Sequence, residues 1–227
     1  MMEFNLSSEQ QELVEKARAF TKEWISPKAV EYDRSGEFPL EICREAFKQG
    51  FMNPHVPVEY GGAAHAVLDH CLVMEELCTG CSGIATAIDA NGLSQYPVIL
   101  AGTDDQKRRF LRPMFTGEEL WCQLFSEPGA GSDLAGLQTK AERDGDHYVL
   151  NGSKTYITNA NLAGAMTVFA QMDPDNPGHM GAFIVETSWE GVRIGKDMPK
   201  MGLRASSTAA IQFKNAHVPR ENLLGQP

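Results

Sequence analysis

The apolar pattern of this 227-residue chain changes its period near Gly117. Before that point apolar residues recur at helical spacing, as they do between Leu13 and Trp24. After it, short runs of alternating apolar and polar residues lie between turn-forming residues, which is typical of strands. Helices first and strands second predict an α+β chain, with a helical domain over residues 1–117 and a β domain over 118–227.

Local motifs refine the helical half. Ser7 followed by Gln10 forms a capping-box pattern, so a helix begins there. Thr103 is a candidate N-cap for a later helix. The stretch 66–90 is apolar on all sides, which predicts a position in the centre of a helical bundle.

The second half carries strand patterns between turn residues. Asn151 and Gly152 separate two strand-like runs, which predicts a hairpin at that point. Further strand-like runs are "MTVFAQM", "GAFIVET", "GVRIG" and "AAIQFKNAHVP". Several short strands without intervening helices predict a barrel-like or sandwich-like β domain.

Composition excludes several classes of function. The net charge of −10 argues against nucleic acid as a partner, because phosphate binding needs a basic face. No apolar run reaches membrane-spanning length and no basic segment precedes an apolar one, so we expect a cytoplasmic protein. The five cysteines have irregular spacing, which argues against a disulfide framework. Cys78 and Cys81 form a lone C-x-x-C, and without a second pair or a histidine motif we expect no metal site.

The run "SEPGAGSD", residues 126–133, is the most informative loop. Its glycines leave backbone N–H groups bare, and its serines add hydroxyl donors. Such a surface suits an acceptor-rich planar ring, a phosphate or an oxyanion. No G-K-[ST] follows, and no G-x-G-x-x-G joins a strand to a helix, so it is neither a Walker loop nor a dinucleotide-binding fingerprint. Taken alone, it is equally compatible with a tight turn or a β-bulge.

The flanking motifs decide between these interpretations. Those of the second half are "QLFSEPGAGSDLAG", "YVLNGSKTYITNA" and "MGLRASST". Those of the first half are "EYDRSGEFP", "HVPVEYGG", "MEELCTGCSGIATAI" and "AGTDDQKRRFL". Together and in this order, they closely resemble the acyl-CoA dehydrogenase family over essentially the whole chain, most of all its medium-chain and short-chain members.

This resemblance implies an FAD-dependent enzyme that removes two hydrogens from the α and β carbons of an acyl-CoA thioester. It implies electron transfer flavoprotein as the electron acceptor, and an oligomer, which is a tetramer in the family. The family fold has an N-terminal helical domain, a middle β domain and a C-terminal helical bundle. The sequence matches the first two, so we expect the bundle to be absent from this chain.

The resemblance also assigns site residues. The expected cofactor-binding residues are Gln123, Phe125, Ser126, Gly131, Ser132, Tyr156, Ile157 and Thr158. The expected acyl-CoA contacts are Ser132, Thr86, Asp89, Leu93 and Tyr96. Asp89 is costly in an apolar tunnel unless it is exposed or paired, so acyl length cannot be inferred from it.

Other residues receive supporting roles. Glu127 and Asp133 are expected to fasten the loop rather than to form a catalytic acid pair. Arg204 belongs to a turn that supports the substrate and flavin region in the family. Ser207 stands where many relatives have aspartate, so we expect the ion pair of that aspartate to be missing.

No residue matches the family's catalytic glutamate, so we expect no catalytic base in this chain. Three explanations remain open: a truncated or split-gene product, one subunit of a hetero-oligomer, or a non-catalytic module that binds acyl-CoA or a protein. A flavin oxidase or monooxygenase relative is a further alternative.

Overall fold

The computed structural model describes residues 5–111, 120–173, 175–176 and 178–225. The chain forms two compact units, which we call the helical unit (1–92 and 200–206) and the sheet unit (93–199 and 207–227). The predicted boundary at 117/118 lies outside the described residues. No helix in the described parts of the chain has both the length and the apolar character needed to span a membrane.

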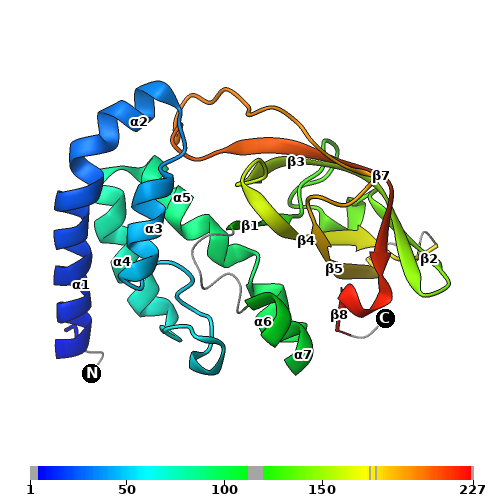
Figure 1. Ribbon diagram of the computed structural model, residues 1–227, viewed down its shortest axis with the longest axis horizontal. Coiled ribbons are helices and arrows are strands. Elements are labelled where there is room, and N and C mark those ends of the chain that lie inside the picture. The colour runs from blue at the N-terminus through cyan, green and yellow to red at the C-terminus, as the bar shows by residue number, and fades with distance from the viewer. Residues whose placement is uncertain (1–4, 112–119, 174, 177, 226–227) are drawn as a thin grey trace. The chain divides into compact units, whose positions relative to one another are not determined.

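The helical unit is built mainly from α-helices (Figure 1). Their bounds are α1 Ser8–Phe20, α2 Ala29–Ser35, α3 Leu40–Lys48, α4 Val67–Gly80 and α5 Ser82–Leu93. The predicted capping box at the start of α1 is confirmed. The Gln10 N–H donates to Ser7 Oγ at 3.2 Å, and the Ser7 N–H donates to Gln10 Oε1 at 3.1 Å.

The apolar stretch 66–90 is divided between two helices with different burial. In α5, eight of the twelve residues are buried, as predicted for a central helix. In α4 only Val73 and Leu77 are buried, and Val67 and Leu68 are exposed, so the prediction is wrong for this helix. An apolar sequence shows which surfaces are suited to burial but not which of them have a neighbour within the chain.

Residues 200–206 join the helical unit from far along the sequence. The Arg204 guanidinium donates to the Asp33 carboxylate at 3.0 Å and to the Asp33 carbonyl at 2.5 Å. Gly83 lies against Leu203, where an added Cβ would come within 3.3 Å of backbone atoms. Arg204 therefore fixes this segment to the end of α2.

The sheet unit contains a mixed sheet (Figure 1). Its strands are β1 Leu120–Leu124, β2 Lys140–Asp144, β3 His147–Thr158, β4 Ala163–Gln171, β5 Met180–Glu186, β6 Val192–Ile194, β7 Thr208–Pro219 and β8 Leu223–Leu224. Their order is β6-β7-β3-β2-β4-β5-β8, and β1 pairs with β4 in parallel. The predicted strands of the second half are thereby confirmed.

The core of this unit lies within the sheet. Every described strand except β6 contributes buried side chains to it, and Val192 and Ile194 of β6 pack against it. Tyr148 and Phe183 meet there, edge to face, with 5.0 Å between ring centroids. Since strands from both ends of the order share this core, the sheet folds over onto itself, as expected for a barrel-like or sandwich-like domain.

The predicted hairpin at Asn151 and Gly152 is wrong. β3 runs through both residues without a turn, and the chain reverses instead at Gly145, between β2 and β3. A Cβ on Gly152 would lie 2.4 Å from Thr139 Oγ1, so the glycine permits close packing at a bulge.

The short helices α6 Tyr96–Ala101 and α7 Asp104–Gln106 also belong to the sheet unit. Thr103 caps α7 as predicted, because its hydroxyl accepts the Gln106 N–H at 3.2 Å. The Gln106 side chain also donates to the carbonyls of Glu221 and Leu223, at 2.8 and 2.9 Å.

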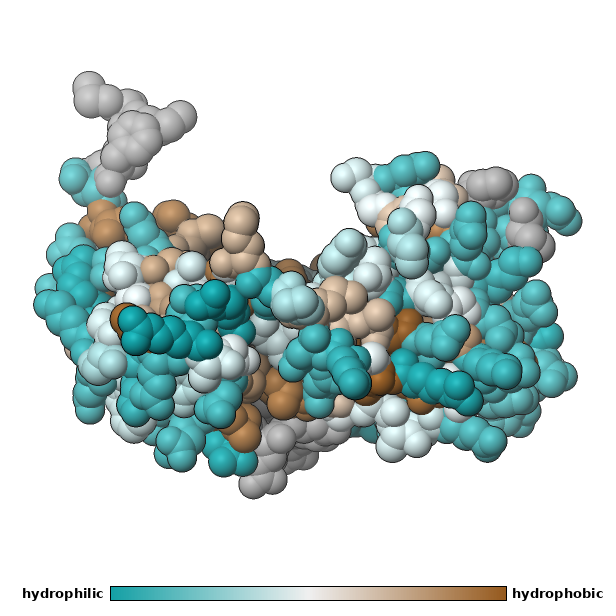
Figure 2. All heavy atoms as spheres, turned by 90° about the horizontal axis from the view of Figure 1, so that it is seen from above, coloured by the Kyte–Doolittle hydropathy of each residue, from teal (hydrophilic) through white to brown (hydrophobic). Residues whose placement is uncertain are grey.

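Hydrophilic residues occupy most of the face shown in Figure 2, with hydrophobic side chains between them.

Candidate functional site

The candidate site begins where β1 ends. β1 runs parallel to β4, and the next residue, Phe125, stacks on Phe169 of β4 with 3.8 Å between ring centroids. Residues 126–133 follow this contact in the chain. We call these residues the small-residue loop.

Hydrogen bonds fix the first residues of the loop to β3. The Thr155 N–H donates to the Ser126 carbonyl at 2.9 Å, and Lys154 Nζ donates to the Phe125 carbonyl at 3.0 Å. The loop therefore lies beside residues 154 and 155, directly before Tyr156.

Glu127 is the main internal fastener of the loop. Its carboxylate accepts hydrogen bonds from the N–H groups of Gln138 and Thr139, at 2.7 and 3.0 Å, and from Lys154 Nζ at 2.8 Å. Burial opposes ionisation of Glu127, but these donors outweigh it and hold its pKa below the ordinary value. Burial lowers the pKa of Lys154, and the Glu127 carboxylate opposes that shift. The structural role predicted for Glu127 is confirmed, whereas Asp133 is exposed.

Tyr156 lies in a β-bulge of β3. Thr155 and Tyr156 together oppose the single residue Ala210 of β7. Tyr156 has a φ of 57°, and its side chain is 71% exposed. A left-handed conformation at a residue with a side chain costs roughly 1–3 kcal/mol, and such strain clusters at functional sites. The bulge thus presents an aromatic ring to the outside at the end of β3.

The glycines of the loop are not explained by the fold itself. A Cβ added to Gly129 or Gly131 would meet nothing within 4 Å, and neither residue has a positive φ. In the part of the chain that the structure describes, the N–H groups of Gly131 and Ser132 bond to no backbone carbonyl. This bare backbone fits an acceptor-rich group that approaches closely, as the edge of a flavin ring does.

The remaining predicted cofactor residues lie around the same end of the sheet unit. Gln123, Ser126 and Thr158 are partly buried and Ser132 is exposed. Ile157 is different, because its side chain is 2% exposed and belongs to the core. Only the backbone of Ile157 is available to a ligand.

Comparisons with known proteins identify the family. Models of the acyl-CoA dehydrogenase N-terminal domain and middle domain match residues 7–118 and 122–216. The chain belongs to the acyl-CoA dehydrogenase family.

Individual relatives support the family assignment. The chain is 39% identical, over its whole length, to a probable medium-chain specific acyl-CoA dehydrogenase of Caenorhabditis briggsae, and covers 56% of that protein. It is 40% identical to a 3-(aryl)acrylate reductase of Clostridium sporogenes, with 96% of this chain and 59% of the relative covered. The structure of butyryl-CoA dehydrogenase from Megasphaera elsdenii matches with a TM-score of 0.93 and 35% identity, over 99% of this chain and 60% of that one. The chain thus spans about 60% of the length of these acyl-CoA dehydrogenase relatives.

The predicted acyl-CoA contacts are divided between the two units of this chain. Thr86 and Asp89 belong to the helical unit, and Leu93 and Tyr96 to the sheet unit. The Thr86 hydroxyl donates to the Ser82 carbonyl of its own helix at 2.7 Å. Ser132, the fifth predicted contact, also belongs to the sheet unit, so neither unit contains all five and their grouping stays a prediction.

Sequence reasoning missed the partner of Asp89. Its carboxylate lies 2.8 Å from Nε2 of His70 on α4, which meets the requirement that this acid be paired. The two residues are 19 positions apart and no motif connects them.

In the sheet unit, Ser207 donates to Asp197 at 2.6 Å, and the Asn161 amide donates to the same carboxylate oxygen at 2.8 Å. Position 207 therefore carries a neutral hydroxyl that is hydrogen-bonded to a carboxylate.

Proposed function

We propose that this chain forms part of an FAD-dependent acyl-CoA dehydrogenase that introduces a double bond between the α and β carbons of an acyl-CoA thioester. The observation that carries the proposal is the exposed, strained Tyr156, on the strand to which the small-residue loop is hydrogen-bonded, together with the bare N–H groups of Gly131 and Ser132. An aromatic face together with free backbone donors is what a flat ring with polar edges requires.

The chain's own residues serve binding and orientation. FAD, when bound, accepts the two electrons of the oxidation. The Ser126 hydroxyl and the N–H groups of Gly131 and Ser132 are positioned to donate to the polar edge of its ring, and such donors favour added electron density. Tyr156 covers a ring face, and Thr158 adds a hydroxyl at the end of β3. The Glu127–Lys154 pair holds the loop in place for these contacts.

The proposal extends to substrate and partners. The acyl-CoA is contacted by Ser132, Thr86, Asp89, Leu93 and Tyr96. The base that takes the α-proton is not among the residues of this chain. Electrons pass to electron transfer flavoprotein, and the protein works as a homo- or hetero-oligomer in the cytoplasm. Acyl length is left open.

Flavin binding is the first test. The purified chain is titrated with FAD, and bound flavin is measured from its visible absorption and by calorimetry. Gly131→Val places a side chain in the open space above the loop, so we expect at least a tenfold loss of FAD affinity without loss of fold. Ser188→Val is the matched control, an exposed loop residue elsewhere in the sheet unit, and its affinity stays unchanged. A chain that binds no FAD, or a Gly131→Val variant with normal affinity, would overturn the proposed site.

Turnover separates the enzymatic alternatives. Because the proposed base lies outside this chain, saturated acyl-CoA thioesters of increasing chain length are added without O₂ to the assembled protein that contains that base, and bleaching of the flavin is followed. Bleaching shows dehydrogenation, and its dependence on chain length gives the substrate class. Flavin that stays oxidised favours the non-catalytic binding subunit, and H₂O₂ formed on admitting air favours an oxidase or monooxygenase relative.

A further inference from the structure

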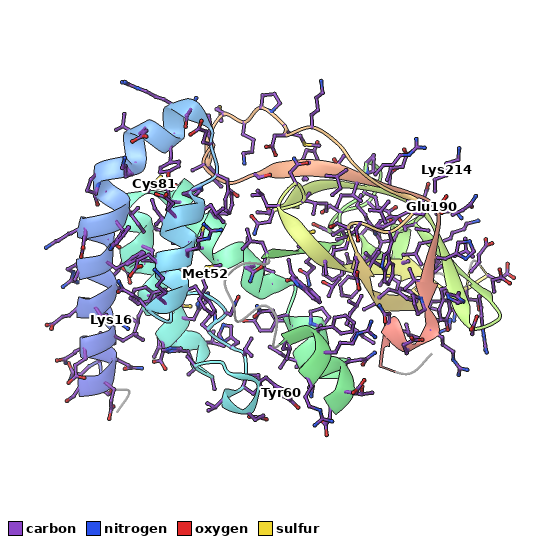
Figure 3. The ribbon with its side chains drawn as sticks, viewed as in Figure 1. Lys16, Met52, Tyr60, Cys81, Glu190 and Lys214 are labelled. Carbon is purple, nitrogen blue, oxygen red and sulfur yellow. The ribbon has the colours of Figure 1, made fainter. Side chains whose placement is uncertain are left out.

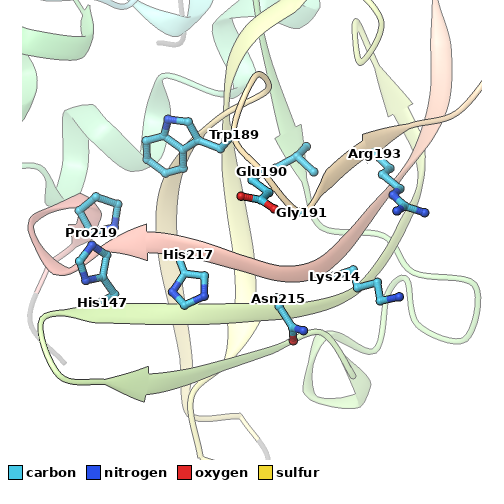
Figure 4. Close-up of a pocket in the computed structure, with 10 residues that line it drawn as sticks. His147, Trp189, Glu190, Gly191, Arg193, Lys214, Asn215, His217 and Pro219 are labelled. Carbon is cyan, nitrogen blue, oxygen red and sulfur yellow. The ribbon is translucent and has the colours of Figure 1, made fainter.

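A second concave region lies on the sheet unit, away from the small-residue loop. It has a volume of about 840 Å³ and lies along β3, β6, β7 and the turn before β6 (Figure 4). Its charged and ring-bearing lining residues are His147, Trp189, Glu190, Arg193, Lys214 and His217. We call it the β7 pocket. None of the predicted flavin or acyl-CoA residues lines it.

The β7 pocket carries more positive than negative charge, within a chain whose net charge is −10. Its permanent cations are Arg193 and Lys214, and the carboxylate that lines it is that of Glu190. Over the described ranges neither cation forms an ion pair, although Lys214 and Glu190 lie in the same region of the sheet unit (Figures 3 and 4). Both cations are exposed and available to an external anion.

Three rings add flat surfaces to the pocket. Trp189 is partly buried against the sheet core, which fixes its indole. His147 and His217 lie on adjacent strands with 6.3 Å between ring centroids, and His147 Nδ1 lies 2.5 Å from the Asp146 carboxylate. The Asp146 contact involves only the His147 imidazole, and the described parts of the chain show no hydrogen bond of the His217 ring.

The wall that carries Lys214 is preformed. The Lys214 N–H donates to the Gly191 carbonyl at 2.9 Å, and a Cβ on Gly191 would lie 2.5 Å from the Lys214 carbonyl. Gly191 and Asn215 have φ values of 87° and 49°, and the Asn215 N–H donates to Asn151 Oδ1 at 2.8 Å. A fixed wall lowers the ordering cost that a ligand must overcome.

We propose that the β7 pocket binds a small molecule with a flat ring and an oxyanion, the chemistry of a nucleoside monophosphate. Arg193 and Lys214 hold the phosphate, and the indole and imidazole rings contact the base. The volume lies within the range of pockets for small organic ligands and exceeds what inorganic phosphate alone fills.

The experiment is a titration of the ¹⁵N-labelled chain followed by amide chemical shifts, with adenosine monophosphate, adenosine and inorganic phosphate as probes. We expect saturable shifts of the Gly191 and Lys214 amides and the Trp189 indole with adenosine monophosphate. Adenosine and phosphate alone bind at least tenfold more weakly. Shifts confined to Gly131 and Ser132 would place the nucleotide at the small-residue loop and overturn the proposal.

Charge variants test the recognition itself. Lys214→Glu weakens binding of adenosine monophosphate at least tenfold, and Glu190→Gln strengthens it severalfold. Lys22→Glu is the matched control, an exposed lysine of the helical unit without an ion pair in the described structure, and its affinity stays unchanged. Equal effects of the two lysine variants, or no saturable shift at the β7 pocket, would refute the proposal. None of these readouts depends on flavin, so the outcome is independent of the proposed dehydrogenase activity.

Discussion

Replacement of Lys154 by methionine is the sharpest test of how the small-residue loop is held. The Lys154 side chain is 0% exposed and that of Glu127 is 5% exposed, so water cannot replace the lost ammonium. Methionine fills a similar volume but leaves the Glu127 carboxylate without its cation and the Phe125 carbonyl without its donor. The variant therefore isolates the electrostatic contribution from the packing contribution.

The expected cost follows from the remaining contacts. Removal of one partner from a buried ion pair destabilises a protein by about 3–5 kcal/mol. Glu127 keeps its hydrogen bonds from the N–H groups of Gln138 and Thr139, which places the expected loss near the lower end, at about 3 kcal/mol. This is a large share of a typical total of about 5–15 kcal/mol.

Urea denaturation measures this loss, and hydrogen exchange of the Thr155 amide reports the loop directly, because that N–H bonds to Ser126. Lys140→Met is the matched control at an exposed strand position, with an expected change within about 0.5 kcal/mol. The double variant Glu127→Gln/Lys154→Met removes both charges and should recover more than about 1 kcal/mol of the loss. A cost below about 1 kcal/mol for Lys154→Met, or no recovery in the double variant, would show that the buried ion pair does not hold the loop.

Three further outcomes are expected. The pKa of Glu127 is lowered in the folded chain, so its ionised form stabilises the fold above about pH 4.5. This stabilisation is lost as the pH falls through the folded-state pKa. Glu127→Gln should therefore flatten the acid limb of a curve of unfolding free energy against pH. Tyr156→Gly should change the free energy of unfolding by less than about 1 kcal/mol while FAD affinity falls, whereas Tyr148→Ala, a change at a buried position of the same strand, should cost about 3–5 kcal/mol. Burial raises the pKa of the Cys122 thiol to about 12, so iodoacetamide at pH 8 should modify the exposed Cys71 and spare Cys122, as measured by mass spectrometry.

The sequence predicted those structural features that depend on residues close together in the chain. The predicted capping box at Ser7 and the predicted N-cap at Thr103 formed because the partners in each lie within one helical turn. β4, β5, β6 and β7 formed where strand-like runs predicted them. The hairpin prediction at Asn151 and Gly152 was wrong because an Asn-Gly dipeptide suits both a tight turn and a β-bulge. The close packing of Gly152 against Thr139 decides for the bulge.

Contacts between residues far apart in the chain could not be predicted from the sequence. Lys154 and Glu127 are 27 residues apart, and His70 and Asp89 are 19 apart on separate helices. Each pair follows from the packing of whole elements, for which no spacing rule exists. The requirement was nevertheless foreseeable for Asp89, because an acid on an apolar helix must be paired or exposed. Physical reasoning predicted the need for a partner, and the fold supplied its identity.

The glycines show how a binding surface differs from the rest of the fold. Gly152 is required internally, since a Cβ there would lie 2.4 Å from Thr139 Oγ1. Gly129 and Gly131 meet no such limit, because their Cβ positions are open and neither has a positive φ. Tyr156 presents the opposite anomaly, a side chain in a backbone conformation that favours glycine, with its ring exposed. The two glycines and the exposed tyrosine belong to two segments of the sheet unit, which the hydrogen bond from the Thr155 N–H to the Ser126 carbonyl joins. Packing within the described chain requires neither glycine, and the flavin site proposed above accounts for both glycines and for the exposed tyrosine.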